Sequence, residues 1–178
     1  MEEAAVISRM RSGSTDAFAE VIEQYQTAII RYLYRFTGDY ELAQDLAQDT
    51  FVQAYQSILK TDSELQLKAW LYKIAANNAL QHARRKKILF FIPLSIEKVD
   101  SKTAHDFQYD RIGERLEIRQ ALAAVLPAQR NCLVLHYVEG FKYKEIAGIL
   151  GISEEAVRKR TARGKEEFRK HYTGGDNK

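Results

Sequence analysis

The segment near the C-terminal end of the sequence carries an unusual density of positive charge. Between Glu154 and Lys170, seven residues are basic and four are acidic. Arginine and lysine side chains at this density can neutralise the phosphates of a nucleic acid, and a few of them can reach base edges. For a basic helix taken alone, a solvated surface with ion pairs one turn apart is the competing interpretation.

A short apolar helix and a tight turn precede this basic segment, and they favour DNA binding. Ile146, Ala147 and Leu150 share one helix face. Gly151 permits the turn, and Ser153 can cap the next helix because its hydroxyl accepts a free backbone N–H. Two short helices with this spacing form a helix-turn-helix, whose second helix enters the major groove.

We expect Val157 to pack inward, which turns the opposite face of the second helix outward. The residues expected on that face are Glu155, Lys159, Ala162, Arg163 and Glu166, flanked by Arg158 and Arg160. The candidate contacts to duplex DNA are Lys144, Arg158, Lys159, Arg160 and Arg163.

A second set of aromatic and basic side chains lies on a helical stretch from Leu67 to Lys87. It comprises Trp70, Tyr72, Lys73, Asn77, Arg84, Arg85, Lys86 and Lys87. Aromatic residues on a helix more often belong to the core than to a binding surface, and Trp70 is expected in the core.

A third set forms the polar face of the helix that precedes it. The apolar stripe of that helix contains Leu46, Ala47, Thr50, Phe51, Ala54 and Ile58. The opposite face carries Glu41, Asp45, Gln48, Asp49, Val52 and Gln56. Taken alone, such a face is usually solvated.

The sequence argues against catalysis and against a metal or cofactor site. Its four histidines are scattered, and neither their spacing nor the single Cys132 fits a metal-ligand pattern. Cys132 lies in an apolar run and is expected to be buried. There is no glycine-rich phosphate loop. No apolar stretch is long enough to span a bilayer, so we expect a soluble cytoplasmic protein without enzymatic activity.

The elements that position these residues are expected to be helices throughout. Apolar residues from Phe18 to Phe36 recur at spacings of three and four, after possible caps at residues 14–16. Residues 37–39 end that helix and start the next, which runs to about Ile58. A loop over residues 59–64 and the helix over 67–87 follow.

Helical periodicity fails from about residue 90 and returns near Ile112. The intervening residues include Pro93 and scattered polar side chains and show no clear period, which predicts a linker over residues 90–111. Pro127, Gly140 and Gly151 then divide the remainder into short helices. We therefore expect an all-α protein of two small helical domains joined by a flexible linker, at residues 1–89 and 112–178.

Two long motifs in this order resemble a known family. The segment "LPAQRNCLVLHYVEGFKYKEIAGILGISEEAVRKRTARGKEEFRK" (residues 126–170) is similar to region 4 of bacterial sigma factors of the extracytoplasmic-function (ECF) group. The segment "DYELAQDLAQDTFVQAYQSI" (39–58) resembles region 2.2 of that group. The segment "KAWLYKIAANNALQHARRKK" (68–87) resembles regions 2.3 and 2.4.

The resemblance implies a role for each surface. Asp45, Gln48 and Asp49 would contact core RNA polymerase. The 67–87 helix, with the loop from Lys60 to Glu64, would hold the single strand of the melted minus-ten element, and its candidate contacts are Tyr72, Lys73, Asn77, Arg84 and Arg85. The helix-turn-helix would recognise the minus-35 element, and an anti-sigma factor is implied as a further partner.

The chain departs from the family pattern at four positions. Ala156 and Lys159 replace a common threonine and serine, Thr161 replaces an apolar residue, and Gln81 replaces an aspartate. A helix-turn-helix regulator that binds duplex operator DNA without polymerase remains the alternative, and an adaptor that binds only protein is a third possibility.

Overall fold

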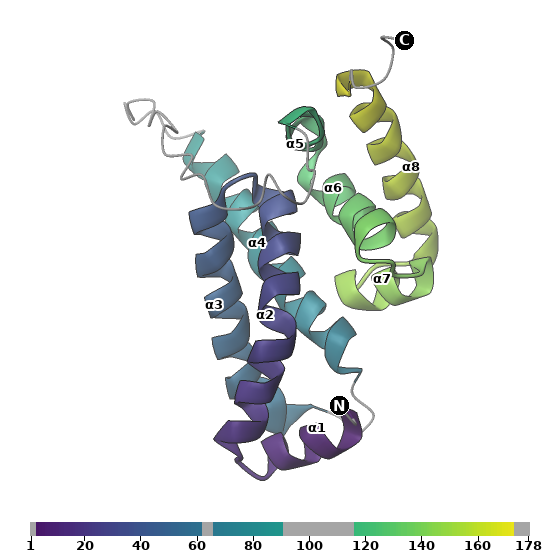
Figure 1. Ribbon diagram of the computed structural model, residues 1–178. Coiled ribbons are helices and arrows are strands. Elements are labelled where there is room, and N and C mark those ends of the chain that lie inside the picture. The colour runs from purple at the N-terminus through teal and green to yellow at the C-terminus, as the bar shows by residue number, and fades with distance from the viewer. Residues whose placement is uncertain (1–2, 62–65, 91–115, 173–178) are drawn as a thin grey trace.

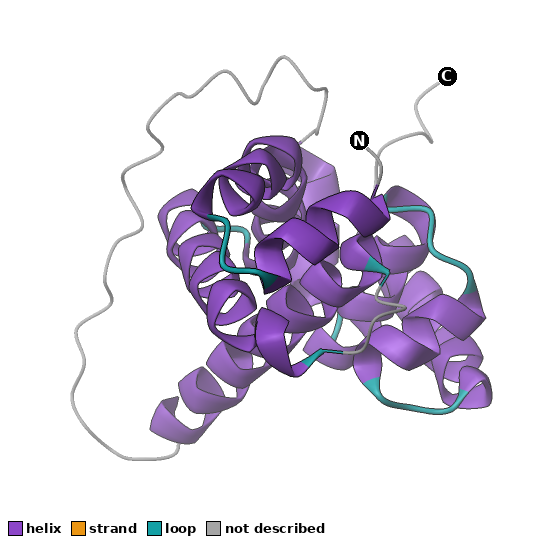
Figure 2. Cartoon of the chain, turned by 90° about the horizontal axis from the view of Figure 1, so that it is seen from below, coloured by secondary structure: helices purple, strands orange, loops and turns teal. Residues whose placement is uncertain are grey.

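The computed structural model describes residues 3–61, 66–90 and 116–172, and every regular element within them is a helix (Figure 2). The all-α expectation is therefore confirmed. The elements are α1 (Glu3–Arg11), α2 (Thr15–Thr37), α3 (Tyr40–Ser57), η1 (Ile58–Lys60), α4 (Leu67–Phe90), α5 (Leu116–Ala124), α6 (Pro127–Leu133), the π-helical turn η3 (Val134–Val138), α7 (Tyr143–Leu150) and α8 (Glu154–His171).

Helices α2, α3 and α4 form a three-helix bundle, with α1 across one end (Figure 1). We call α1–α4 the N-terminal unit. Ser14 caps α2 by accepting the backbone N–H of Ala17, and Gly38 ends the helix with a φ of 73°. These are the limits that the sequence predicts, because glycine adopts the left-handed conformation without steric cost.

The core of the bundle is formed by apolar stripes at helical spacing. All six residues of the predicted inward stripe of α3 are buried, and the six on its opposite face are exposed or partly exposed. On α4, Ala75, Ala76 and Ala79 are buried, and such small side chains let neighbouring helices approach closely.

A buried polar network also joins α3 to α4. Asn78 donates from its amide to the Thr50 hydroxyl at 3.3 Å and accepts from the Gln53 amide at 3.1 Å. The Thr50 hydroxyl in turn donates to the Leu46 carbonyl. Asn78 therefore has a structural role, whereas its neighbour Asn77 is exposed.

Helix α1 was not anticipated from the sequence. The Glu3 carboxylate accepts the backbone N–H of Leu67 at the start of α4, and the Arg11 guanidinium donates to the Thr61 carbonyl. One helix thus holds both ends of the segment that contains residues 62–65. Residues 62–64 of the predicted loop lie outside the described residues, as does the predicted linker from residue 91 onward, while residues 59 and 60 belong to η1.

We call α5–α8 the C-terminal unit. Pro127 begins α6, as expected from its fixed φ, and Gly151 ends α7 with a φ of 64°. Ser153 caps α8 by accepting the Ala156 N–H, with Glu154 and Glu155 in the first turn. The predicted helix-turn-helix is therefore present as α7 and α8. No helix in the described parts of the chain is long and apolar enough to cross a membrane.

Helix α8 packs closely against α6. Val157 is fully buried, as predicted. A Cβ on Gly164 would lie 3.0 Å from a methyl carbon of Leu133, so only glycine fits this crossing without a shift. Cys132 on α6 is buried, and burial raises the pKa of its thiol to about 11, so it is a core residue as expected.

Thr161 is a poorly satisfied side chain in this packing. It is 2% exposed, and its hydroxyl has no hydrogen-bond partner within the described structure. Thr161→Val removes the unpaired hydroxyl at nearly constant shape. It should raise the free energy of unfolding by about 1 kcal/mol, or the melting temperature by about 2–4 °C. Thr161→Ser, which keeps the hydroxyl and loses the methyl, should lower it. A thermal melt in which valine destabilises would contradict this account.

Candidate nucleic-acid interface

The outward face of α8 matches the sequence prediction. Glu155, Lys159, Ala162, Arg163 and Glu166 are exposed, as is Arg158, and Arg160 is partly exposed. Lys144 on α7 is also exposed. Because Val157, Thr161 and Gly164 fill the inward positions, the fold fixes which side of α8 can meet a ligand.

Two of the candidate DNA contacts on α8 already have ion-pair partners on the same helix. The Arg158 guanidinium lies 2.7 Å from the Glu154 carboxylate, and the Lys159 ammonium lies 2.6 Å from that of Glu155. Both pairs are well exposed and contribute little to stability. Arg163 forms no ion pair with another described residue, which leaves it the most available cation of this face.

Of the predicted DNA contacts on α4, four are exposed and one is buried. Lys73, Asn77, Arg84 and Arg85 are exposed. Tyr72 is not: it is 1% exposed and hydrogen-bonded to Glu139 of the C-terminal unit. The assignment of Tyr72 to a DNA-facing surface is therefore wrong for this arrangement, because its inward register places the ring in the core.

A basic groove lies between the start of α4 and α7. It is lined by Lys60, Thr61, Gln66, Ala69, Trp70, Lys73, Lys142, Lys144, Glu145, Gly148 and Ile149. Two candidate contacts from different units, Lys73 and Lys144, are thereby brought to one groove. Trp70, which was expected in the core, packs against the core but is only partly buried.

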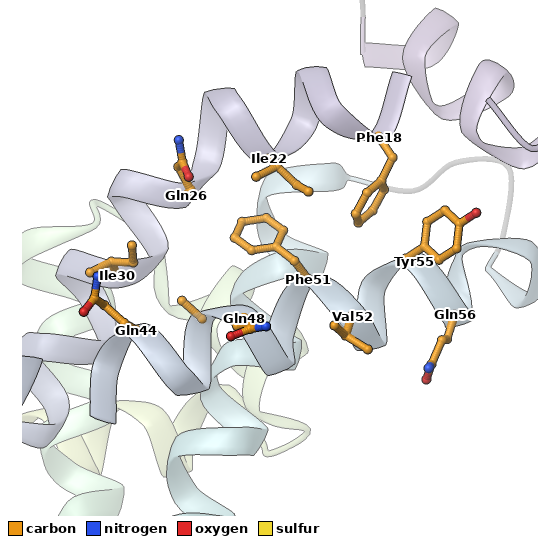
Figure 3. Close-up of a pocket in the computed structure, with 11 residues that line it drawn as sticks. Phe18, Ile22, Gln26, Ile30, Gln44, Gln48, Phe51, Val52, Tyr55 and Gln56 are labelled. Carbon is orange, nitrogen blue, oxygen red and sulfur yellow. The ribbon is translucent and has the colours of Figure 1, made fainter. Parts of the chain in front are cut away.

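The polar face of α3 borders a second groove, whose apolar floor comes from α2 and α3. Phe18, Ile22 and Ile30 of α2 face Phe51, Val52 and Tyr55 of α3 across it (Figure 3). Gln48 lies on its rim, while Asp45 and Asp49 are exposed on the same helix. Val52 and Tyr55 are each about half exposed, at 48% and 49%. A face that joins exposed apolar side chains to a polar rim is typical of a protein-binding surface.

The two units touch through polar and aromatic side chains that the sequence did not indicate. The Tyr32 hydroxyl of α2 donates to the Asn131 side chain of α6, and the Tyr72 hydroxyl donates to the Glu139 carboxylate at 2.5 Å. Burial, followed by the charge of Glu139, raises the pKa of both phenols, so both remain donors. The only sequence signal is the inward helical register of Tyr32 and Tyr72, since a buried hydroxyl needs a partner.

Arg130 provides a further link. Its guanidinium donates to the carbonyls of Phe36, Ala123 and Val125, and it stacks over the Phe36 ring at 5.5 Å. Burial lowers its pKa. Arg130 thereby connects the end of α2 to the α5–α6 turn. Among the described residues, no cluster of histidine, cysteine and acidic side chains could hold a metal ion.

Comparison with protein families finds two matches in this chain. Residues 21–88 match the family described as "Sigma-70 region 2", and residues 105–168 match "Sigma-70, region 4". The first segment contains most of α2, all of α3 and most of α4, and the second contains α7 and most of α8.

Several relatives align with this chain over most of their own length. The ECF RNA polymerase sigma factor SigW of Bacillus subtilis is 29% identical over 175 residues, covering 92% of this chain and 93% of the relative. The RNA polymerase sigma factor CarQ of Myxococcus xanthus is 30% identical over 168 residues, covering 92% and 93%. The RNA polymerase sigma factor YlaC of Bacillus subtilis is 30% identical over 161 residues, covering 89% and 93%.

Solved structures share the fold at lower identity. CnrH, solved in complex with the cytosolic domain of CnrY, aligns with a TM-score of 0.68 at 22% identity, covering 94% of each chain. The sigma factor RpoE of Bartonella quintana, solved with the anti-sigma factor NepR, aligns at 0.66 and 22% identity, covering 86% of this chain and 94% of that one.

Arg163 and Glu155 should affect binding of duplex DNA in opposite directions. Arg163→Ala removes an unpaired cation from the exposed face of α8. If Arg163 meets a phosphate, it should weaken binding of all sequences and reduce the salt slope by about one. Glu155→Gln removes a negative charge and frees Lys159, so it should strengthen binding. Glu117→Gln on the exposed surface of α5 is the matched control. Fluorescence anisotropy over a salt series measures the binding of duplex DNA by all three variants. Unchanged binding by Arg163→Ala would exclude the exposed face of α8 from the DNA interface.

Proposed function

This chain belongs to the sigma-70 family, as an alternative sigma factor of the ECF group, and we propose which of its surfaces performs each step of initiation. A sigma factor binds core RNA polymerase and directs promoter-specific transcription. The match of regions 2 and 4, in that order within one chain, is the observation that carries this conclusion.

We assign the α3 surface to core polymerase. Asp45, Gln48 and Asp49 are exposed beside the groove of Figure 3. The apolar floor of the groove would supply buried area, and the polar rim would supply orientation and hydrogen bonds. These side chains contribute little to the fold of the unit, which makes them free to serve an interface.

We assign the exposed side of α4 to the separated strand of the minus-ten element. Lys73, Asn77, Arg84 and Arg85 lie along it, where cations can follow a single-strand backbone. The exposed face of α8, with Arg158, Lys159 and Arg163, is assigned to the minus-35 element, and Arg160 and Lys144 lie at its margin. On this assignment, residues 1–89 and 112–178 act on different parts of one promoter, and residues 90–111 connect them.

The remaining properties follow from the same assignment. The protein would act in the cytoplasm, where bacterial core polymerase is found, without a catalytic centre or cofactor of its own. Its fold resembles that of the RpoE chain solved with an anti-sigma factor, which supports a regulatory partner of that kind for this chain. That likeness does not identify the partner.

A double substitution on α3 should separate polymerase binding from stability. Asp45→Ala with Gln48→Ala removes two exposed side chains, and exposed substitutions change the free energy of unfolding by less than about 0.5 kcal/mol. At an interface the loss is larger, because the partner's desolvated polar atoms are left unpaired. We expect nearly unchanged thermal melts and strongly weakened association with core polymerase.

Competition against another sigma factor measures the association of each variant with core polymerase. Glu20→Gln on the exposed face of α2 is the matched control. If the double variant competed as well as the unsubstituted chain, α3 would not be part of the polymerase interface. If the unsubstituted chain failed to bind core polymerase and bound duplex operator DNA alone, the helix-turn-helix regulator would replace the proposal.

The α4 cations should matter most after the strands separate. Arg84→Ala with Arg85→Ala should reduce formation of the open promoter complex more than initial duplex binding, because these cations would contact the unpaired strand. Permanganate footprinting reports strand opening, and filter binding on closed duplex reports the earlier step. Equal losses at both steps would argue against a specific role in melting.

A further inference from the structure

The basic groove between the start of α4 and α7 gathers positive charge from both units. The two helices lie side by side (Figure 1), and the groove between them has a volume of about 790 Å³. Its described lining includes two lysines from each unit, Lys60, Lys73, Lys142 and Lys144. All four are exposed, and none forms an ion pair with another described residue. With Glu145, this lining has a net charge of +3, as much as the whole chain.

The acidic side chain of this lining already has a structural role. The Glu145 carboxylate accepts the backbone N–H of Lys142 at 2.6 Å, which holds it at the start of α7. The four ammonium groups are therefore left to repel one another across the groove. A molecule with several negative charges, bound between the two walls, would replace this repulsion by attraction.

Contacts outside the groove hold its walls in place. The Arg11 guanidinium donates to the carbonyl of Thr61, which lines the groove. The Glu3 carboxylate accepts the backbone N–H of Leu67 at the start of α4. On the opposite wall, α7 is anchored in the core by Ile146, which is fully buried. A groove with fixed walls loses little conformational freedom when a ligand binds.

Gly148 leaves space in the groove for a reason other than helix packing. It lies inside α7, where glycine is less favourable than alanine. A Cβ at this position would meet no other atom within 4 Å, so packing does not require glycine. Trp70 also lines the groove and is only partly buried. The groove therefore combines open space and an aromatic ring with its four cations.

We propose that the basic groove is a binding site for a small molecule that carries a chain of linked phosphates. A lysine ammonium is a point charge that suits phosphate oxygens, and cations on both walls suit a ligand whose charges follow one another along a chain. Inorganic polyphosphate and a nucleoside polyphosphate share this chemistry, and the base of the second could stack on Trp70. The bound molecule would cover Lys73 and Lys144, two of the candidate DNA contacts, and would therefore weaken promoter binding.

The fluorescence of Trp70 provides a direct test, because it is the only tryptophan in the chain and lines the groove. Titration of the full-length chain with tripolyphosphate, and separately with ATP, should change this fluorescence and reach saturation below about 1 mM. Tighter binding of ATP would identify a nucleoside polyphosphate as the ligand. Equal binding would identify the phosphate chain alone.

Substitutions on both walls locate the binding site. Lys60→Gln and Lys142→Gln each remove one cation and should weaken binding by about twofold to fivefold, the effect of one exposed charge pair. Gly148→Leu fills the open space without changing the charge and should weaken binding further, while leucine is tolerated in the helix. Lys86→Gln is the matched control, because it removes an exposed lysine of α4 that does not line the groove. Thermal melts show whether each variant is folded.

A single DNA strand is the competing occupant of the groove. Its phosphates are spaced by sugars, so a short oligothymidylate of similar net charge should bind more weakly than tripolyphosphate or ATP. Equal or tighter binding of the oligothymidylate would overturn the proposal and assign the groove to the path of the strand.

Three further results would also overturn the proposal. They are the absence of a saturable change in fluorescence, equal losses with Lys86→Gln and Lys142→Gln, and full binding by a folded Gly148→Leu variant. The inference goes beyond the proposed function and does not rest on it. All of these titrations use the free chain, so their outcome is independent of whether the chain binds core polymerase.

Discussion

A buried phenol has to donate its hydrogen, and this constraint organises the contact between the two units. Tyr32 and Tyr72 are 0% and 1% exposed, with ring centroids 5.2 Å apart in the N-terminal core. Neither hydroxyl finds its acceptor within that unit. Both donate to the C-terminal unit, one to Asn131 and the other to Glu139. These two hydrogen bonds therefore help to fix the relative position of the units, together with the apolar cluster that runs through both.

The sequence predicts local structure well wherever a residue type has a local cause. Ser14, Gly38, Gly151 and Ser153 set the helix limits that were expected, since capping and left-handed φ values depend on neighbouring backbone alone. The inward stripe of α3 and the outward face of α8 follow from helical periodicity. The exposure of the candidate side chains was therefore largely foreseeable.

Long-range partners were not foreseeable from local patterns. Tyr32 and Asn131 are 99 positions apart, and Tyr72 and Glu139 are 67 apart. Tyr72 was misassigned because an aromatic ring among lysines looks the same whether it faces ligand or core. Helix α1 was missed because it is short, and its role as an anchor for Thr61 and Leu67 depends on side chains that reach across the fold.

The close crossing of α6 and α8 separates two kinds of position on the recognition helix. A Cβ at Gly164 would lie only 3.0 Å from a methyl carbon of Leu133, and Val157 and Thr161 fill the rest of the crossing. Lys159, Ala162 and Arg163 face away from it. A new DNA preference could therefore be grafted onto this scaffold by exchanging outward side chains alone. Transplanting a whole helix from a relative would also require its neighbours on α6 to shift by a few tenths of an ångström, unless the donor brought a glycine to that crossing.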